Sequence, residues 1–218
     1  MAGWEKIITF ADMIRKFLLC SIMAAASLSA TAKVDLAKYH DEIVNLSVDE
    51  NLQFPEVPTK YVAQAQAEMS KLRERFAHMG FQTDLSEREG LVLMVTIPVS
   101  DLFLPNDTLL ASFANPKLKN LMHPLRSPDM FKTLIVVHSD DTGSEEYLYT
   151  LTRARADAIR QWIADEQLPV DGIVPYGLGF DEPVSNESSR KGRAANRRVE
   201  IYFLPGPLMV ESLKSSKR

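Results

Sequence analysis

The sequence predicts a two-layer α/β sandwich with the element order β-α-β-α-β-β. Short apolar runs rich in β-branched residues predict the strands, and longer stretches with apolar residues about every three to four positions predict the helices between them. Strands that alternate with helices are typical of a sheet covered by helices. Hydrophobic residues make up 45% of the chain and charged residues 25%, which is enough apolar material for one core.

Residues 33–84 are predicted to be a linker and a helix ahead of the sheet. Pro55 and Pro58 favour extended backbone up to about residue 60. From Tyr61 onward the pattern is helical, and Gly80 fits a helix stop. The apolar stripe of this helix is Met69, Leu72, Phe76 and Met79. Such a stripe is expected to pack into the core, although it also suits a partner-binding face.

The first half of the predicted sheet domain, residues 85–205, contains one strand and a broken helix. Residues 90–98 form a continuously apolar, β-rich run, as expected for a buried strand. Thr108 is predicted to cap the following helix, and Pro116 is predicted to kink it or divide it into two short helices.

The second half contains the longest helix. Residues 133–137 are predicted to be a strand, and Ser144 to cap a helix that reaches about Glu166. Residues 172–176 predict a short strand, a loop follows, and residues 198–203 predict the last strand. The tail, residues 206–218, is expected to fray.

The N-terminus resembles a secretory signal peptide over residues 1–32. Arg15 and Lys16 precede a short apolar run that ends in small residues, so cleavage is predicted after Ala32. Met13 is an alternative start. Cys20 has two interpretations, a lipid-accepting cysteine or an ordinary signal-peptide residue; bulky Leu19 before it favours the second. Export to the periplasm, free or associated with the outer membrane, is expected.

Composition argues against one broad function class. The formal net charge is only −4, which disfavours general nucleic-acid binding. No cofactor motif stands out, and Gly177-Leu-Gly179 is too short to indicate a phosphate loop.

The stretch from His138 to Arg155 carries the strongest functional signal. A strand runs into an acidic turn, and the turn opens a helix, so Asp140 and Arg155 are placed beside free backbone N–H groups. An acceptor and a permanent donor together suit a ligand that has both an ammonium and a carboxylate. Taken alone, these residues are more simply explained as a turn residue, Asp140, and a surface cation, Arg155. His138 with Asp140 and Asp141 also raises a weaker metal-site hypothesis.

Four motif blocks then resemble the OmpA-like peptidoglycan-binding domain family. They are His138-Ser-Asp-Asp-Thr-Gly-Ser144, Leu151-Thr-Arg-Ala-Arg-Ala156, Tyr176-Gly177 and Gly192-Arg-Ala-Ala-Asn-Arg-Arg-Val-Glu-Ile201. The resemblance implies that Asp140 binds the ammonium of the diaminopimelate in the peptidoglycan stem peptide, and that Arg155 binds its carboxylate. It also implies that backbone N–H groups at Asp141, Thr142 and Gly143 donate to the same or a neighbouring carboxylate.

The sequence departs from the family at two positions in this region. Val137 stands where the family usually has glycine, and Leu148 where it usually has asparagine. Val137 suits a strand, whereas Leu148 removes a polar contact. Among Arg193, Arg197 and Arg198, which are expected to close the last strand against acidic neighbours, one is expected to flank the pocket.

The predicted function is non-enzymatic binding of peptidoglycan that anchors or tethers the cell envelope. Two alternatives remain at this point. One is an envelope assembly protein that docks a protein partner through the domain or through its upstream helix, at the face formed by Leu72 and Phe76. The other is a wall-degrading enzyme, although the sequence offers no carboxylate pair of the kind a glycosidase needs.

Overall fold

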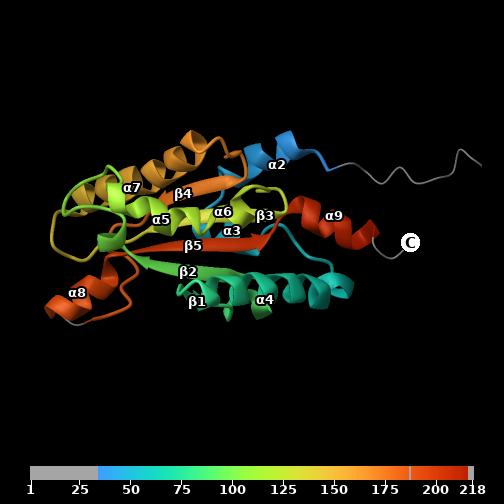
Figure 1. The fold of residues 1–218 in the computed structure, drawn as a ribbon, viewed down its shortest axis with the longest axis horizontal. Coiled ribbons are helices and arrows are strands. Elements are labelled where there is room, and N and C mark those ends of the chain that lie inside the picture. Colours follow the sequence, from blue (N-terminus) through green and yellow to red (C-terminus); the bar gives the residue numbers. More distant parts are fainter. Residues whose placement is uncertain (1–33, 187, 216–218) are drawn as a thin grey trace, which may run out of the picture. The chain divides into compact units, whose positions relative to one another are not determined.

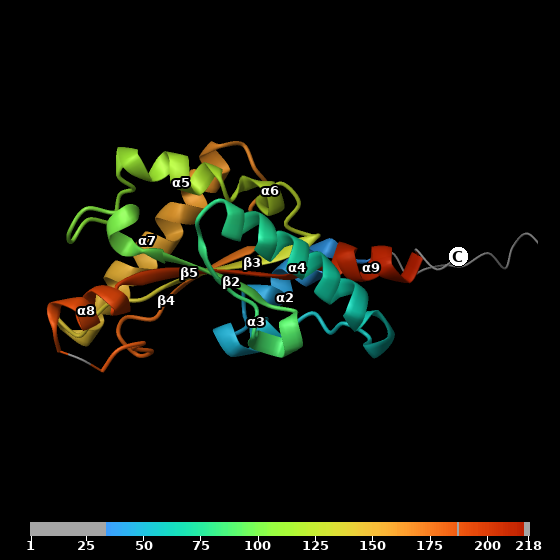
Figure 2. The same ribbon diagram turned by 60° about the horizontal axis from the view of Figure 1, so that its bottom comes forward.

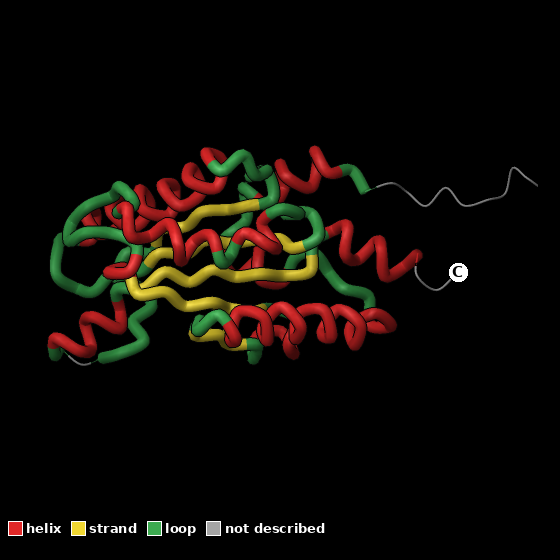
Figure 3. The backbone as a smooth tube through the Cα atoms, in the orientation of Figure 1, coloured by secondary structure: helices red, strands yellow, loops and turns green. Residues whose placement is uncertain are grey.

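A five-stranded sheet with the order β1-β2-β5-β3-β4 organises the chain (Figure 1). The computed structural model describes residues 34–186 and 188–215. The strands are β1 Gln82–Asp84, β2 Leu93–Pro98, β3 Phe131–Val137, β4 Ile173–Gly177 and β5 Arg198–Pro205. The four longer strands are the predicted ones, and the three-residue β1 adds a short antiparallel edge to β2. Figure 3 shows these strands as a single layer. The predicted mixed α/β class is confirmed.

Strand β5 lies at the centre of the sheet because it pairs antiparallel with both β2 and β3. β3 pairs parallel with the edge strand β4, and the 21-residue helix α7, Glu145–Asp165, makes the crossover between them. Ser144 caps α7 as predicted, since its side chain accepts from the backbone N–H of Tyr147 at 3.4 Å. The end of β3 and the beginning of α7 therefore lie together at one end of the sheet.

One face of the sheet carries the main hydrophobic core, which α4 (Val62–His78) and α7 cover (Figure 2). Alternate residues of β2, β3 and β5 point into it, as the strand period requires. Met69, Leu72 and Phe76 of α4 are at most 4% exposed, as the predicted stripe requires, whereas Met79 is 41% exposed. Because Leu72 and Phe76 are buried in this core, that face of α4 is not open to a partner. Docking of a protein partner through another part of the domain stays a prediction.

The opposite face of the sheet is covered by the N-terminal segment. Residues 34–60 do not form the predicted extended lead-in: they contain helix α2, Leu36–Ile43, and helix α3, Val48–Gln53. Each begins with a side-chain cap, from Asp35 and from Ser47. Tyr39 and Ile43 pack against apolar residues of β3, β4 and β5 in a second core cluster. Pro55 and Pro58 follow the end of α3, so they interrupt neither α2 nor α3.

Polar contacts attach this segment to the sheet. Lys132 of β3 is fully buried, and its Nζ donates to the carbonyls of Asn51 at 2.7 Å and Phe54 at 2.6 Å. The hydroxyl of Tyr176 on β4 donates to the carbonyl of Leu46 at 2.7 Å. These bonds give side-chain donors to carbonyls at and just beyond the ends of α2 and α3. The Asn51 carbonyl also accepts from the backbone N–H of Phe54 at 3.3 Å.

Between β2 and β3 the chain forms short helices. Thr108 caps no helix: α5 spans Asn115–Lys119 and α6 spans Met122–Leu125, after the 3₁₀ turns Val99–Asp101 and Ser112–Ala114. Pro116 stands in the first turn of α5, where a missing N–H costs nothing, and the break falls after it. The prediction of two short helices is confirmed, but their start and the role of Pro116 are corrected.

Two further helices replace predicted irregular structure. α8, Arg190–Asn196, lies in the loop before β5 and is capped by Ser189. α9, Pro207–Ser215, forms from the tail that was expected to fray, and Met209 and Val210 are buried against the core. Two 3₁₀ turns, Thr59–Tyr61 and Glu87–Gly90, complete the elements.

The predictions for the N-terminus fall outside the described residues. They are the signal peptide over residues 1–32, the alternative start at Met13 and the two interpretations of Cys20. Among residues 34–186 and 188–215, the helices are too short or too polar for any of them to span a bilayer.

Candidate functional site

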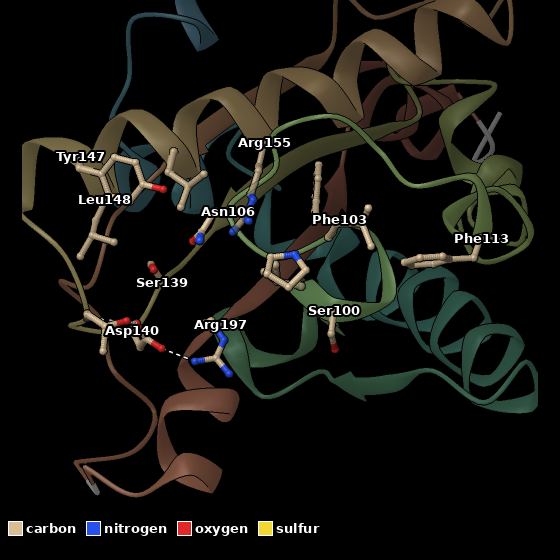
Figure 4. Close-up of a pocket in the computed structure, with 15 residues that line it drawn as sticks. Ser100, Phe103, Asn106, Phe113, Ser139, Asp140, Tyr147, Leu148, Arg155 and Arg197 are labelled. Atoms are coloured by element: carbon tan, nitrogen blue, oxygen red, sulfur yellow. Dashed lines mark hydrogen bonds and ion pairs between the residues drawn. The ribbon is translucent and has the colours of Figure 1, made fainter.

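A cleft of about 410 Å³ opens at the end of the sheet where β3 leads into α7 (Figure 4). Its walls come from the loop after β2, the turn after β3, the first three turns of α7 and the residue before β5. The lining residues are Val99, Ser100, Phe103, Leu104, Pro105, Asn106, Phe113, Ser139, Asp140, Thr142, Tyr147, Leu148, Leu151, Arg155 and Arg197. The cleft thus lies at the carboxyl end of β3, where elements distant in sequence meet.

Asp140 supplies the carboxylate of the cleft. It follows β3 by three residues and is only 2% exposed. One oxygen, Oδ1, accepts from the backbone N–H of Thr142 at 3.0 Å and from the Thr142 hydroxyl, and Oδ2 pairs with Arg197. Burial raises the pKa of Asp140, but the hydrogen bonds from Thr142 and Arg197 outweigh it, so this pKa lies below its ordinary value. Asp140 is therefore ionised at neutral pH.

Arg155 supplies a cation on the α7 side and is only 3% exposed. Its Nε donates to the backbone carbonyl of Asp107 at 2.8 Å, and its guanidinium carbon lies 5.2 Å from the centre of the Phe103 ring. Burial lowers the pKa of Arg155, with a partly opposing contribution from Tyr147 and Asp107. The ordinary pKa of an arginine lies so far above neutral pH that Arg155 stays charged. One hydrogen bond and one aromatic face hold the guanidinium with its remaining donors toward the cleft (Figure 4).

Comparisons with known proteins agree with this geometry. Residues 102–197 match the OmpA family. These residues form an OmpA-family domain.

The chain is similar to the outer-membrane lipoprotein YfiB of Pseudomonas aeruginosa, at 32% identity over 91 residues. That match covers 40% of this chain and 54% of YfiB, so the chain spans about half the length of this curated relative. It is also similar to the peptidoglycan-binding protein ArfA of Mycobacterium tuberculosis, at 36% identity over 64 residues, or 29% of this chain and 20% of ArfA. Because its curated relatives include outer-membrane proteins, the protein is assigned to the periplasm, free or associated with the outer membrane.

Among solved structures, a MotB-like protein from Desulfovibrio vulgaris shares the fold. The superposition has a TM-score of 0.59 at 20% identity and covers 67% of this chain and 98% of that chain. At this level of identity the match supports the fold of the OmpA-family domain and no more.

The turn of the OmpA-family domain differs in part from the sequence prediction. Thr142 lines the cleft, but its backbone N–H is already bonded to Asp140, so the expected free donor is not free. Asp141 lies outside the cleft and lines a neighbouring hollow with Arg193 and Asn196. Gly143 is exposed and is not among the residues that line the cleft. The turn folds back on the Asp140 carboxylate, which explains why its N–H groups do not all point into the cleft.

Three contributions to the site were not assigned from the sequence. Phe103 and the carbonyl of Asp107 position Arg155, and both come from a loop about fifty residues earlier in the chain. Arg197 was grouped with two other arginines, one of which was expected to flank the pocket, and the structure identifies Arg197 as that one. Arg198 instead pairs with Glu200 at 2.6 Å, as expected for an arginine that closes the last strand. No local pattern distinguishes Arg197, the residue between α8 and β5, from Arg198, the first residue of β5, although their side chains emerge on different sides.

The two departures from the family pattern have different consequences. Val137 is fully buried within β3, opposite Val199 of β5, as a strand residue can be. Leu148 is 2% exposed and forms an apolar wall of the cleft together with Leu151. Figure 4 shows Leu148 beside Tyr147 at the beginning of α7.

The metal-site hypothesis finds no support in the arrangement of its residues. His138 points away from Asp140, since its Nε2 lies 3.1 Å from a carboxylate oxygen of buried Glu200. Within residues 34–186 and 188–215, no cluster of three or more potential metal-binding side chains occurs.

Proposed function

We propose that this cleft binds peptidoglycan non-covalently through the diaminopimelate of the stem peptide. Asp140 would bind the free ammonium of that residue and Arg155 the adjacent carboxylate. The observation that carries the proposal is that a buried carboxylate and a buried guanidinium line the same 410 Å³ cleft. The relative ArfA is a peptidoglycan-binding protein, which supports the same class of ligand.

The chemistry of the two side chains suits this ligand. Asp140 is held ionised and offers an acceptor, while Arg155 offers a planar set of donors that matches a carboxylate. Both are shielded from water, so each contact is stronger than it would be on an exposed surface. Leu148 and Leu151 provide an apolar wall for the methylene chain that connects the two centres of diaminopimelate.

The proposed role is binding without catalysis. A glycosidase places two carboxyl groups across the scissile bond. Of the cleft's lining residues within the described chain, Asp140 alone carries a carboxylate, and Arg197 already pairs with it. An envelope protein that binds the wall in this way would anchor or tether the envelope to it.

Co-sedimentation with purified wall tests the proposal. The mature protein is expected to sediment with sacculi that contain diaminopimelate. It is not expected to sediment with lysine-type wall, because a lysine side chain offers the ammonium without the adjacent carboxylate. Asp140→Asn and Arg155→Ala should each weaken binding at least roughly thirtyfold, because removing one partner of a desolvated charge contact costs about 2 kcal/mol or more.

The matched control is Asp141→Asn, which removes the neighbouring carboxylate outside the cleft and should bind as the unchanged protein does. Thermal melting shows whether each variant is folded. Equal sedimentation of folded Asp140→Asn, Arg155→Ala and Asp141→Asn would refute the proposed site.

A further inference from the structure

The cleft contains more positive charge than a single amino-acid zwitterion requires. Among its lining residues in the described part of the chain, Asp140 is negative, and Arg155 and Arg197 are positive. A ligand with one ammonium and one carboxylate is neutral, so it would leave one guanidinium without a ligand partner. The excess cation favours a ligand with an additional anionic group.

Nearby acidic groups do not cancel this excess inside the cleft. Asp107 acts electrostatically on Arg155, but its Oδ1 accepts from the backbone N–H of Leu109 at 2.9 Å, and Asp107 is not a lining residue. Asp141 faces the neighbouring hollow, and Glu145 and Glu146 are exposed in the first turn of α7. Arg155 and Arg197 are close enough to oppose each other's charge. An anion between them would relieve that repulsion.

Arg197 has a fixed backbone and an accessible side chain. Its backbone N–H donates to the carbonyl of Arg193 at 3.2 Å, and its own carbonyl accepts from Val99 at 3.0 Å. The side chain is 41% exposed, whereas the Asp140 side chain with which it pairs is 3% exposed. An ammonium that binds Asp140 would compete with Arg197 for the same carboxylate. The released guanidinium would still lie at the rim of the cleft (Figure 4).

We infer that Arg197 selects stem peptides that carry a second free carboxylate besides the one at the diaminopimelate zwitterion. In this structure Arg197 neutralises Asp140. When the ligand's ammonium takes over that role, Arg197 binds the second carboxylate. Amidation of that carboxylate would remove the interaction, so the cleft would discriminate against amidated wall. This inference rests on the proposed function and assigns a specificity-determining residue to it.

Two synthetic peptides test it. Both are N-acetyl-alanyl-γ-glutamyl-diaminopimelate with a free zwitterion at the terminal centre of the diaminopimelate. In one, the remaining carboxylates are free, and in the other they are carboxamides. Calorimetric titration of the full mature chain should show about tenfold tighter binding of the free acid, since a charge-assisted contact contributes enough to change affinity by roughly that factor.

The variants distinguish binding of the ligand's second carboxylate by Arg197 from competition between Arg197 and the ligand's ammonium for Asp140. Arg197→Gln should bind both peptides with nearly equal affinity, and Arg197→Lys should retain part of the preference because it keeps the charge without the planar fork. Arg190→Gln is the matched control, because it removes an exposed arginine from the preceding helix, α8, at a position that does not line the cleft. It should keep the full preference.

Each other result overturns the inference in a recognisable way. Equal binding of the two peptides, with tighter binding of both by Arg197→Gln, would show that Arg197 only competes with the ammonium. A preference for the free acid that survives in folded Arg197→Gln would assign the discrimination to another residue. Binding of neither peptide by the unchanged protein would overturn the proposed function itself, and with it this inference.

Discussion

The burial of Lys132 predicts how the free energy of unfolding changes with pH. Its ammonium lies in the sheet face under α2 and α3, fully buried. Burial lowers its pKa to about 7 from an ordinary value of 10.5, with a further lowering from the nearby charge of Arg88. A neutral amine still has two N–H donors, and two carbonyls, those of Asn51 and Phe54, accept from it. Deprotonation therefore removes the buried charge without removing either hydrogen bond.

The sign follows from proton linkage. Between pH 7 and pH 10 the unfolded chain keeps the proton on Lys132 while the folded chain loses it, so the free energy of unfolding contributed by this group rises with pH. With pKa values of about 7 and 10.5, the rise amounts to about 3.5 kcal/mol over that range.

Urea denaturation at pH 7, 8, 9 and 10 measures this rise as a difference between proteins. The unchanged protein should gain stability relative to Lys132→Met as pH increases. Subtracting the free energy of unfolding of the variant removes the contributions of all other titrating groups. Lys71→Met serves as a control, because Lys71 is an exposed lysine on α4 that pairs with Glu68, and its difference should stay flat. A Lys132→Met difference that is constant or falls with pH would refute the reasoning.

Three further predictions concern stability. Burial raises the pKa of Glu200, but hydrogen bonds from His138, Tyr202 and Arg198 lower it to about 2. Glu200→Gln should therefore lower the free energy of unfolding by about 3 kcal/mol at neutral pH. This deficit, measured by urea denaturation, should shrink as pH falls from 4.5 toward 2. An undiminished deficit at pH 2 would contradict the assigned cause. Gly177→Ala should lower the melting temperature strongly, because a Cβ there would lie 2.2 Å from the backbone nitrogen of Arg153 on α7; an unchanged melting temperature would show that α7 and β4 can separate freely. Ser144→Ala should cost about 1 kcal/mol through loss of the α7 cap, and an unchanged denaturation midpoint would mean that water replaces it.

The sequence determined the sheet-forming strands and the long helix because their signals are local. The apolar, β-rich run at residues 133–137 predicts a strand from its own composition. Ser144 predicts a helix start from the helical pattern that directly follows it. The short helices α2, α3 and α9 were not predicted, because their stability comes from packing. Tyr39 and Ile43 bury themselves against strands more than ninety residues away, and short helices are marginal without such contacts.

The site shows the same division. The sequence alone, read beside a family resemblance, indicated Asp140 and Arg155 as the ligand-binding pair, because they fall within one strand, turn and helix. The tertiary structure was needed to show that Thr142 and Arg197 bond to the Asp140 carboxylate, and that Phe103 and the carbonyl of Asp107 position Arg155. The physical reason is that local pattern fixes which residues emerge near one turn. The partners of a buried charge come from distant loops and strands, and the strand order of the sheet determines which of these lie beside it.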